Sequence, residues 1–326
     1  MKAIITEHYG SPDVLKLSDV DKPSLKPDEV LIHVRAASIN SADHRLMRAT
    51  PVWIRAMGMG LLRPKKRIPG VDMAGIVEAV GAAVKRYQPG DEVYGDVMEA
   101  SGGSFAEYLS APEGIAIAIK PKNMTFEQAA AVPIAGITAL QALRDRAAIK
   151  AGDTVLINGA SGGVGTFAVG LAKAFGADVT GVCSTRNVEL VRSLGADHVI
   201  DYTKQGVSKL DQRFDVILDI AANLTAKDYV RLLAPGGHGV LVGFSTMFHM
   251  AGIMLRSKKL LKRYGLTVNM LGNTRSNTQD LDTLTALMES GKLTPAIDKT
   301  YPLEKIADAM RYFENEHARA KVVITV

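Results

Sequence analysis

The sequence predicts an α/β protein in which a small, mostly antiparallel β-barrel precedes a doubly wound parallel sheet. The chain has 326 residues, more than the roughly 250–300 at which a single hydrophobic core stops growing, so we expect two domains. Short β-like runs separated by turn residues fill residues 1–120, whereas from residue 153 apolar strands alternate with helical segments. The first pattern is typical of a barrel and the second of a parallel sheet covered by helices.

Residues 1–120 contain the expected barrel strands. The runs AIITEHYG, EVLIHVRAAS, AGIVEAVG, DEVYGDV and FAEYLSA are separated by glycines and prolines, for example Pro23, Pro27, Gly81 and Pro89. Short strands at close spacing with such turns indicate a small antiparallel barrel.

The periodicity changes after residue 121. Thr125 and Gln128 have the spacing of a capping box, and we expect a helix over residues 129–143 that Pro133 interrupts. The runs TVLIN, DVTGVC, DHVIDY, FDVILDI and GVLVGF are continuously apolar, as parallel strands are when both faces of their sheet are buried. LTVNML at residues 266–271 is the candidate for the last strand.

The C-terminal tail departs from this alternation. A long helix over residues 278–290 is followed by a strand, another helix and the terminal run KVVITV. We therefore assign residues 1–121 and 272–326 to the barrel domain, and residues 122–271 to the parallel-sheet domain.

The loop NGASGGVG at residues 158–165 is the clearest binding motif. A buried strand ends at Asn158, and a helix begins within the loop. Gly162 would let the backbone approach a pyrophosphate, Gly165 would let the helix lie close to the strand, and the helix N-terminus offers unpaired N–H groups to phosphate. We expect a dinucleotide here instead of a plain glycine-rich turn. The expected contacts are Ala160, Ser161, Gly162, Gly163 and Val164.

The residues after the next strand favour NADP(H). About 20 residues past the loop, an NAD site places an Asp or Glu on the ribose 2′-hydroxyl. This chain has Ser184, Thr185 and Arg186 there, and a guanidinium with hydroxyl groups suits a 2′-phosphate. The alternative is that Arg186 is only a surface charge.

Short-chain dehydrogenases have a similar loop and need a Tyr-x-x-x-Lys pair on one helix. Tyr301 and Lys305 have that spacing. However, Pro302 favours the first turn of a helix over its interior, which places Tyr301 before the helix. In that family the loop also lies near the N-terminus, so we exclude the match.

The charge pattern and the apolar runs limit the classes of partner that we expect the protein to bind. The net charge is +5, and the basic runs RPKKR at residues 63–67 and RSKKLLKR at 256–263 have no interleaved aromatic residues, so nucleic acid is not expected. An anionic membrane surface or a phosphorylated ligand remains compatible with them. The first residues lack a signal-peptide core and no apolar run reaches the roughly 18 residues of a membrane span, so we expect a cytoplasmic protein.

Segments along nearly the whole chain carry a family resemblance: PDEVLIHVRAASIN, IPGVDMAGIVEAVG, PGDEVYG, AAAVPIAGITALQAL, GDTVLINGASGGVGTFAVGLAKAFGADVTGVCS and PLEKIADAM. They resemble the medium-chain dehydrogenase/reductases, in the zinc-independent quinone oxidoreductase and enone reductase branch. The resemblance implies a GroES-like barrel, completed by the tail, beside a Rossmann domain. It also implies NADPH-dependent reduction of a quinone or of the activated C=C bond of an α,β-unsaturated carbonyl. Many relatives are homodimers, and the sheet edge at residues 266–271 is the expected contact.

The chain departs from the zinc alcohol dehydrogenases of that superfamily at both zinc-ligand positions. Asn40 stands where they carry Cys, and Gly70-Val71-Asp72 stands where they carry Gly-His-Glu. The one cysteine, Cys183, lies in the other domain, and a structural zinc built on thiolates needs four of them. We therefore expect no metal.

The resemblance assigns further residues to the cofactor. It implies that Asn40 contacts the nicotinamide ribose and that Thr138 lies near the carboxamide. It also implies that Tyr202 packs on the adenosine 2′-phosphate and that Phe244 lines the nicotinamide pocket. An ordinary core position is the alternative for Tyr202 and Phe244.

Arg45 is the expected catalytic cation. Without zinc, the substrate carbonyl must be polarised by hydrogen bonds or a cation. By resemblance, Arg45 stands where similar enone reductases carry Lys and the better-known quinone reductases carry Tyr. Arginine keeps its proton at neutral pH, so Arg45 would stabilise an enolate or hydroquinone anion while solvent or His44 protonates it. The alternative is that Arg45 pairs with Asp43 or another carboxylate.

Residues 50–67 are more apolar than a connection needs, and they would cover a long apolar substrate or form a small core under a loop. The apolar residues are Trp53, Ile54, Met57, Met59, Leu61 and Leu62.

A second function class also stays open: an NADPH-binding sensor or scaffold, or an RNA-contacting protein, with little turnover.

Overall fold

A computed structural model describes residues 1–50, 55, 60–243, 263–272, 274–316 and 318–326. They divide into two compact units. The first holds Met1–Ala135, Ser276–Glu289 and Pro295–Val326, and the second holds Gly136–Arg275 and Ser290–Thr294. The C-terminal tail therefore returns to the first unit.

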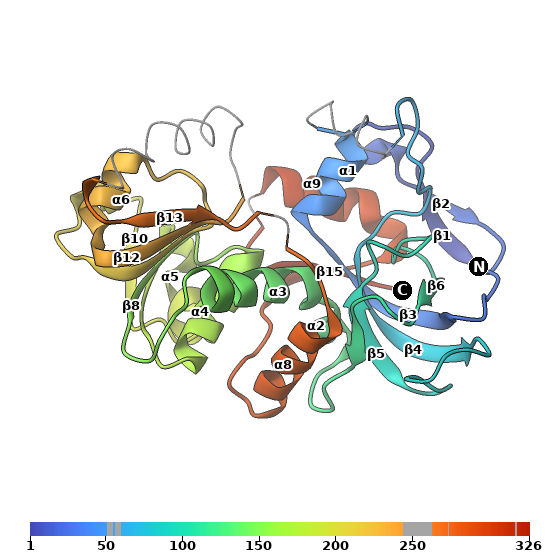
Figure 1. The fold of residues 1–326 in the computed structure, drawn as a ribbon. Coiled ribbons are helices and arrows are strands. Elements are labelled where there is room, and N and C mark those ends of the chain that lie inside the picture. The colour runs from blue at the N-terminus through green and yellow to red at the C-terminus, as the bar shows by residue number, and fades with distance from the viewer. Residues whose placement is uncertain (51–54, 56–59, 244–262, 273, 317) are drawn as a thin grey trace. The chain divides into compact units, whose positions relative to one another are not determined.

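The first unit is built on a seven-stranded sheet in the order β14-β15-β3-β4-β5-β7, with β6 paired to β3 (Figure 1). Its pairs are antiparallel except for β14 with β15, which confirms the mostly antiparallel pattern. β1 and β2 form a separate antiparallel pair. The strands are β1 Lys2–Ile5, β2 Lys16–Asp19, β3 Glu29–Ile39, β4 Asp72–Val80, β5 Glu92–Asp96, β6 Tyr108–Pro112, β7 Ile117–Ile119, β14 Ile297–Pro302 and β15 Lys321–Thr325.

The helices of this unit pack on the sheet through small apolar clusters. One such cluster joins the end of β3 to α1, α9 and β15 through Ile39, Met47, Met310 and Val322. The helices are α1 Ser41–Arg48, α2 Phe126–Ala130, the start of α3 Pro133–Gln141, α8 Thr278–Glu289 and α9 Ile306–Asn315, with 3-10 turns at Pro12–Val14 and Leu303–Lys305.

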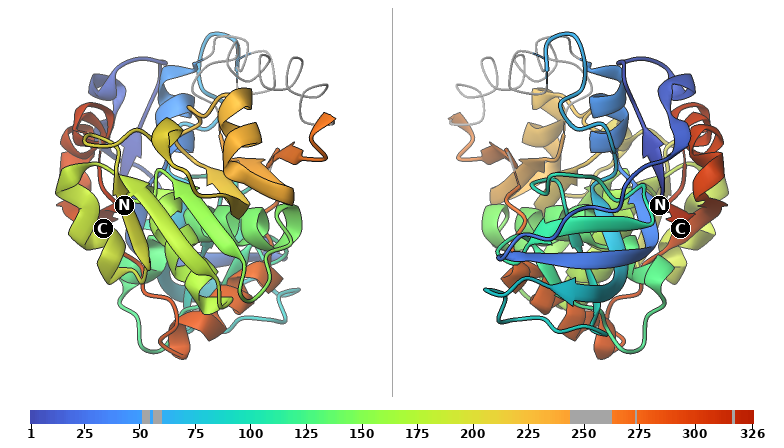
Figure 2. Two further views of the ribbon diagram at one scale, coloured as in Figure 1. Left: turned by 90° about the vertical axis from the view of Figure 1, so that its left-hand side faces the viewer. Right: turned by 90° about the vertical axis from the view of Figure 1, so that its right-hand side faces the viewer.

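The second unit is an entirely parallel six-stranded sheet in the order β10-β9-β8-β11-β12-β13 (Figure 2). In chain order this is 3-2-1-4-5-6, the arrangement of the Rossmann dinucleotide-binding sheet. The strands are β8 Thr154–Asn158, β9 Asp178–Cys183, β10 His198–Asp201, β11 Phe214–Asp219, β12 Leu233–Leu241 and β13 Thr267–Met270. The helices are α4 Gly163–Ala174, α5 Val188–Ser193 and α6 Ala226–Leu232, with 3-10 turns at Thr185–Asn187 and Val207–Lys209 and a π-helical turn at Ala142–Arg146.

Most expected elements are confirmed. Thr125 and Gln128 form the capping box, and the expected helix over residues 129–143 is interrupted at Pro133, which begins α3. LTVNML forms the edge strand β13. Tyr301 lies in β14, ahead of the helix, as its neighbouring proline predicted.

The division between the units lies after Ala135, whereas the sequence placed it after residue 121. The reason is that α2 packs on β3 and β4, with Ala129 and Ala130 completely buried. The tail also differs, since it re-enters the first unit at Ser276 and leaves it briefly over Ser290–Thr294.

The apolar segment before the first basic run lies partly outside the described residues, and so do Trp53, Ile54, Met57 and Met59. Leu61 and Leu62 are 69% and 84% exposed, so they are not core residues. The second basic run is described only at Arg263. Among the described residues, no helix has the length and apolar character to cross a membrane.

Candidate functional site

The parallel sheet reverses its strand order between β8 and β11, and buried polar residues end both strands. Asn158 Nδ2 donates to Asp219 Oδ1 at 2.7 Å and to Asn223 Oδ1 at 2.7 Å. Asp219 Oδ2 accepts from the backbone N–H of Leu224 at 3.0 Å. The loops after the two strands are thus tied together at the point where doubly wound sheets bind their ligands.

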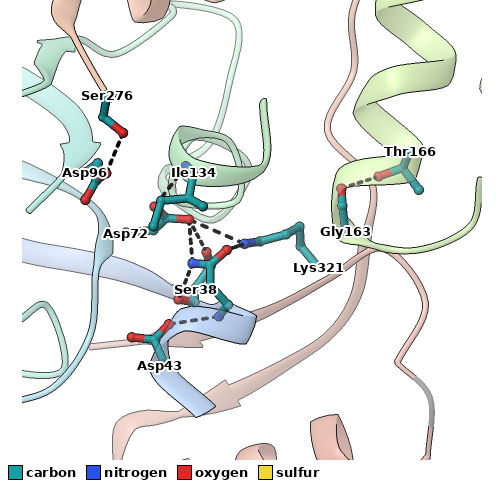
Figure 3. Close-up of polar contacts among 10 residues, drawn as sticks. Ser38, Asp43, Asp72, Asp96, Ile134, Gly163, Thr166, Ser276 and Lys321 are labelled. Atoms are coloured by element: carbon teal, nitrogen blue, oxygen red, sulfur yellow. Dashed lines mark hydrogen bonds and ion pairs between the residues drawn. The ribbon is translucent and has the colours of Figure 1, made fainter. Parts of the chain in front are cut away.

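The glycine-rich loop has the form of a phosphate-binding turn. α4 begins at Gly163 with Gly162 as its N-cap. A Cβ on Gly165 would lie 2.1 Å from the carbonyl oxygen of Gly159, so only glycine lets the helix lie this close to the loop. A Cβ on Gly162 would meet only that same oxygen, at 3.6 Å, which leaves this side of the loop open to a ligand. Thr166 Oγ1 donates to the carbonyl of Gly163 within the first turn (Figure 3).

The structure brings Ser161 and Ser184 together through a residue that the sequence did not single out. Asn187 Nδ2 donates to Ser161 Oγ at 2.9 Å and to Ser184 Oγ at 3.2 Å. Asn187 is buried, and its Oδ1 has no hydrogen-bond partner among the described residues. The only sequence signal for it was an Asn at the start of a helix. It joins the glycine loop to the residues that follow β9.

The expected 2′-phosphate residues are only partly available. Ser184 is partly exposed and Arg186 is exposed, but the Thr185 hydroxyl donates to Asp201 Oδ2 at 2.6 Å. Hydrogen bonds from Thr185 and Thr203 lower the pKa of Asp201. The Thr185 hydroxyl is therefore committed to this carboxylate.

Tyr202 faces a hollow at the ends of the parallel strands. The hollow has a volume of about 280 Å³. It is lined by Asn158, Gly159, Tyr202, Val207, Ala221, Asn223, Leu224 and Asp228. Tyr202 is 57% exposed, so it is not the core residue of the alternative interpretation. An open hollow beside the glycine loop, with an aromatic ring in its wall, suits a nucleotide base.

A second polar cluster lies in the first unit, around Asp72 at the start of β4 (Figure 3). Asp72 Oδ2 accepts from Asn40 Nδ2 at 2.8 Å, from Ser38 Oγ at 3.0 Å and from Lys321 Nζ at 3.4 Å. Its Oδ1 accepts from the backbone N–H of Ile134, in the first turn of α3, at 3.1 Å. Lys321 Nζ also donates to Asn40 Oδ1 at 2.5 Å. Asn40, the expected nicotinamide contact, is thus held by a buried ion pair.

Burial dominates the electrostatics of this cluster. Asp43, whose Oδ2 accepts from the backbone N–H of Asn40 at 2.8 Å, has its pKa raised to about 7, chiefly by burial and secondarily by the Asp72 charge. Burial also raises the pKa of Asp96 to about 6 and lowers that of Lys321. Asp43 Oδ1 is buried without a hydrogen-bond partner among the described residues, which fits a carboxyl group that keeps its proton near neutral pH.

His44 and Arg45 lie on α1 but His44 is not part of the cluster around Asp72. His44 Nε2 lies 3.0 Å from Glu314 Oε1, and Arg48 binds the same carboxylate at 2.7 Å. Desolvation lowers the pKa of His44. Arg45 is partly exposed on the same helix.

Thr138 is 9% exposed on α3. Phe244 lies outside the described residues.

The side chains at the superfamily's zinc positions do not fit zinc. The Cys position holds the Asn40 amide and the His position holds the aliphatic side chain of Val71. The Asn40 amide is bonded to the Asp72 carboxylate and to the Lys321 ammonium group, which has no lone pair to offer a metal. Within the described ranges, no three His, Cys, Asp or Glu side chains are grouped so that they could hold an ion.

Comparisons with known proteins agree with this geometry. Residues 26–121 match the alcohol dehydrogenase GroES-like domain, and residues 194–324 match the zinc-binding dehydrogenase domain. The chain is 37% identical to the 2-methylene-furan-3-one reductase of Solanum lycopersicum and 37% identical to the chloroplastic NADPH-dependent alkenal/one oxidoreductase of Arabidopsis thaliana, each over 99% of this chain and 79% of the relative. The quinone oxidoreductase from Coxiella burnetii has a similar structure, with a TM-score of 0.86 and 30% identity over 100% of this chain and 99% of that one. The chain therefore belongs to the medium-chain dehydrogenase/reductase superfamily of oxidoreductases, with a GroES-like domain and a Rossmann domain.

Proposed function

We propose that the protein is an NADPH-dependent, zinc-independent oxidoreductase. Its substrate is an enone, an alkenal or a quinone, in each of which a carbonyl group is conjugated to a C=C bond. The observation that carries the proposal is that Asn40 stands where the zinc enzymes carry a Cys ligand and is bonded there to Asp72 and Lys321, while Val71 stands where they carry the His ligand. The names of the relatives, which include an alkenal/one oxidoreductase and a quinone oxidoreductase, support the substrate class. The matched region whose description mentions zinc, residues 194–324, contains neither Asn40 nor Val71.

The residues of the second unit fit NADPH, which supplies the hydride when bound. The N-terminus of α4 and the open side of Gly162 suit the pyrophosphate, and the hollow at Tyr202 suits the base. Arg186 and Ser184 suit the 2′-phosphate, because a guanidinium binds phosphate oxygens in a planar fork.

Arg45 acts on the substrate side. Hydride addition to the β-carbon of an enone moves negative charge onto the carbonyl oxygen, and a fixed cation lowers the energy of that state. Arg45 keeps its proton, so it stabilises the enolate without protonating it. Because His44 is committed to Glu314 and its pKa is lowered, solvent is the proton source.

The assembly that fits this unit is a homodimer. β13 is the edge strand of the parallel sheet, and pairing it with a two-fold mate would cover an edge that otherwise invites uncontrolled pairing. We expect light scattering at micromolar concentration to give twice the chain mass, and a monomer mass would rule the dimer out. A cytoplasmic location remains our expectation for the protein.

The test is NADPH oxidation with 2-alkenals, vinyl ketones and quinones, run with the metal content of the protein measured alongside. We expect turnover with at least one of these classes, and the rate should be insensitive to a chelator. Tight NADPH binding without turnover on any class would favour a sensor or scaffold instead. Stoichiometric zinc that is lost together with activity would overturn the metal-free assignment.

A further inference from the structure

Leu61 and Leu62 are the most exposed large apolar side chains among the residues that the structure describes. A single exposed leucine is ordinary on a protein surface, but two in succession keep a continuous apolar area in water. Four basic residues follow within the next five positions. We call residues 60–67 the basic turn. Its leucines contribute little to the core of the first unit, so packing does not explain them.

The backbone of the basic turn holds the leucines in this exposed position. Gly60 has a φ of +105°, and a Cβ there would lie 2.0 Å from the carbonyl oxygen of Arg63, so only glycine allows the chain to fold back on itself here. The Gly60 carbonyl accepts from the Tyr9 hydroxyl at 2.8 Å, and the Arg67 carbonyl accepts from the Thr6 N–H at 2.8 Å. Both ends of the turn are thus fixed to the N-terminal segment of the first unit.

Two cations of the basic turn are not neutralised by a carboxylate. Arg63 and Lys65 are exposed, and neither has an ion-pair partner in the part of the chain that the structure describes. Arg67 differs from them, because its guanidinium pairs with Glu7 at 2.6 Å. Arg63 and Lys65 therefore give the surface next to the leucines a net positive charge.

Met98 adds a third exposed apolar side chain beside the basic turn. The Lys66 ammonium donates to the carbonyl of Met98, whose side chain is 42% exposed. Burial lowers the pKa of Lys66, and the nearby carboxylates of Asp96 and Glu99 oppose that shift. Lys66 is thus balanced by local carboxylates, which leaves Arg63 and Lys65 as the excess charge.

A lipid bilayer with anionic headgroups matches both properties of this surface. Leucine side chains gain free energy when they enter the boundary between headgroups and acyl chains, and each Lys or Arg near an anionic surface adds attraction. Nucleic acid would attract the cations but gains nothing from the leucines. A stable protein partner needs about 800 Å² of surface on each side, which two or three side chains do not supply.

We propose that the basic turn docks the protein on an anionic lipid bilayer, with Leu61 and Leu62 at the level of the upper acyl chains and Arg63 and Lys65 among the headgroups. The binding is weak and reversible, because two leucines bury less apolar surface than a single acyl anchor, which itself binds reversibly. It requires neither NADPH nor a substrate, so it does not rest on the proposed function.

The test is sedimentation of the protein with vesicles of phosphatidylcholine alone and with vesicles of phosphatidylcholine mixed with phosphatidylserine. We expect the protein to sediment with the mixed vesicles at low salt and to be released at high salt, because salt screens the attraction between exposed charges. A protein that does not bind the mixed vesicles, or that binds both kinds equally, would overturn the proposal.

A first pair of variants tests the charges. Arg63→Gln combined with Lys65→Gln should weaken binding to the mixed vesicles by about 25-fold, or about fivefold for each cation. The control combines Lys85→Gln with Lys122→Gln. It removes the same charge from two exposed lysines of the same unit that also lack an ion-pair partner among the described residues, and it should have little effect. Equal losses from both double variants would mean that net charge alone drives the binding, which would overturn the proposal.

A second pair of variants tests the leucines. Leu61→Ser combined with Leu62→Ser keeps the charge and should weaken vesicle binding by about tenfold. The control Leu17→Ser, at an exposed leucine on β2 of the same unit, should bind as the wild type does. These side chains are exposed, so we expect melting temperatures close to that of the wild type. The single variant Leu62→Ser, at the more exposed position, repeats the comparison with a smaller loss.

Two outcomes of the leucine experiment would overturn the proposal. The first is unchanged vesicle binding by the leucine variants, which would show that the protein adsorbs through charge without insertion. The second is an RNA oligonucleotide that displaces the vesicles and binds the leucine variants as tightly as the wild type, which would assign the basic turn to nucleic acid.

Discussion

Arg186 lies on a single 3-10 turn directly after Ser184. A 2′-phosphate held there would gain charge-assisted hydrogen bonds from its guanidinium. Arg186→Ala should weaken NADPH binding by about 1.5–3 kcal/mol and leave NADH binding nearly unchanged. Arg192→Ala, which removes an exposed arginine paired with Glu189, is the control and should affect neither cofactor. Equal losses for both cofactors in titrations of Arg186→Ala would mean that this residue does not meet a 2′-phosphate.

Asp43 links the stability of the first unit to pH. Its pKa rises from the usual 3.8 to about 7 in the folded protein, so the folded state holds this proton more tightly than the unfolded state. The stabilisation is fully present below about pH 4 and is lost as the pH rises through 7. Asp43→Asn keeps an oxygen for the Asn40 N–H but carries no charge. It should raise the free energy of unfolding by on the order of 2 kcal/mol at pH 8 and by much less at pH 4. Urea melts at both pH values measure this difference, and a variant that is destabilised at pH 8 would contradict it.

Arg45 and Arg48 lie on the same helix but have different expected roles. Arg45→Ala should slow hydride transfer by about 10²–10³-fold and leave NADPH affinity intact, because it removes a donor to the developing oxyanion. Arg48→Ala removes a partner of Glu314 and should lower the melting temperature while sparing the rate per folded molecule. Single-turnover kinetics with thermal melts distinguish these outcomes. If Arg45→Ala behaves like Arg48→Ala, Arg45 only braces the fold.

At the scale of elements, two glycines at the start of α4 have different expected roles: Gly165 allows the helix to pack on the loop, and Gly162 leaves room for NADPH. Gly165→Ala should destabilise the second unit, because its Cβ would fall within 2.1 Å of a backbone oxygen that cannot move aside. Gly162→Ala meets only an ordinary contact at 3.6 Å, so it should fold normally but bind NADPH more weakly, by roughly tenfold, because a methyl group then occupies the side open to the pyrophosphate. Melting temperatures and NADPH titrations of both variants test this. A Gly162→Ala variant that binds NADPH with wild-type affinity would contradict the role of Gly162 in binding.

The parallel strands were predictable because local sequence determines them. Runs such as TVLIN and FDVILDI are buried on both faces and became β8 and β11. The pairing of the first unit was not predictable, since β3 joins β15 across most of the chain, and no local pattern encodes such a partner. The division of the compact units after Ala135 was not predictable for a similar reason, because α2 joins the first unit through its packing on β3 and β4.

The candidate site also contains residues that the sequence predicted and residues that it did not. The glycine loop was readable because its spacing follows from backbone geometry. Asn187, Asp219 and Lys321 were not singled out, since each acquires its role from side chains that are distant in sequence. Lys321 meets Asn40 only after the tail returns to the first unit. Solvent or His44 was expected as the proton source, and the pairing of His44 with Glu314 could not be predicted because it depends on where α9 packs.

The whole molecule combines a glycine-rich dinucleotide loop in its second unit with a buried polar cluster around Asp72 in its first. We propose that the protein delivers hydride from NADPH to a conjugated C=C bond without zinc. The most direct measurement uses NADPH deuterated at the transferable C4 position, zinc-depleted enzyme and a vinyl ketone, with the product analysed by NMR. We predict that deuterium appears on the β-carbon and that the α-carbon gains its hydrogen from solvent. An alcohol with deuterium on the carbonyl carbon, or a reaction that requires added zinc, would contradict the account.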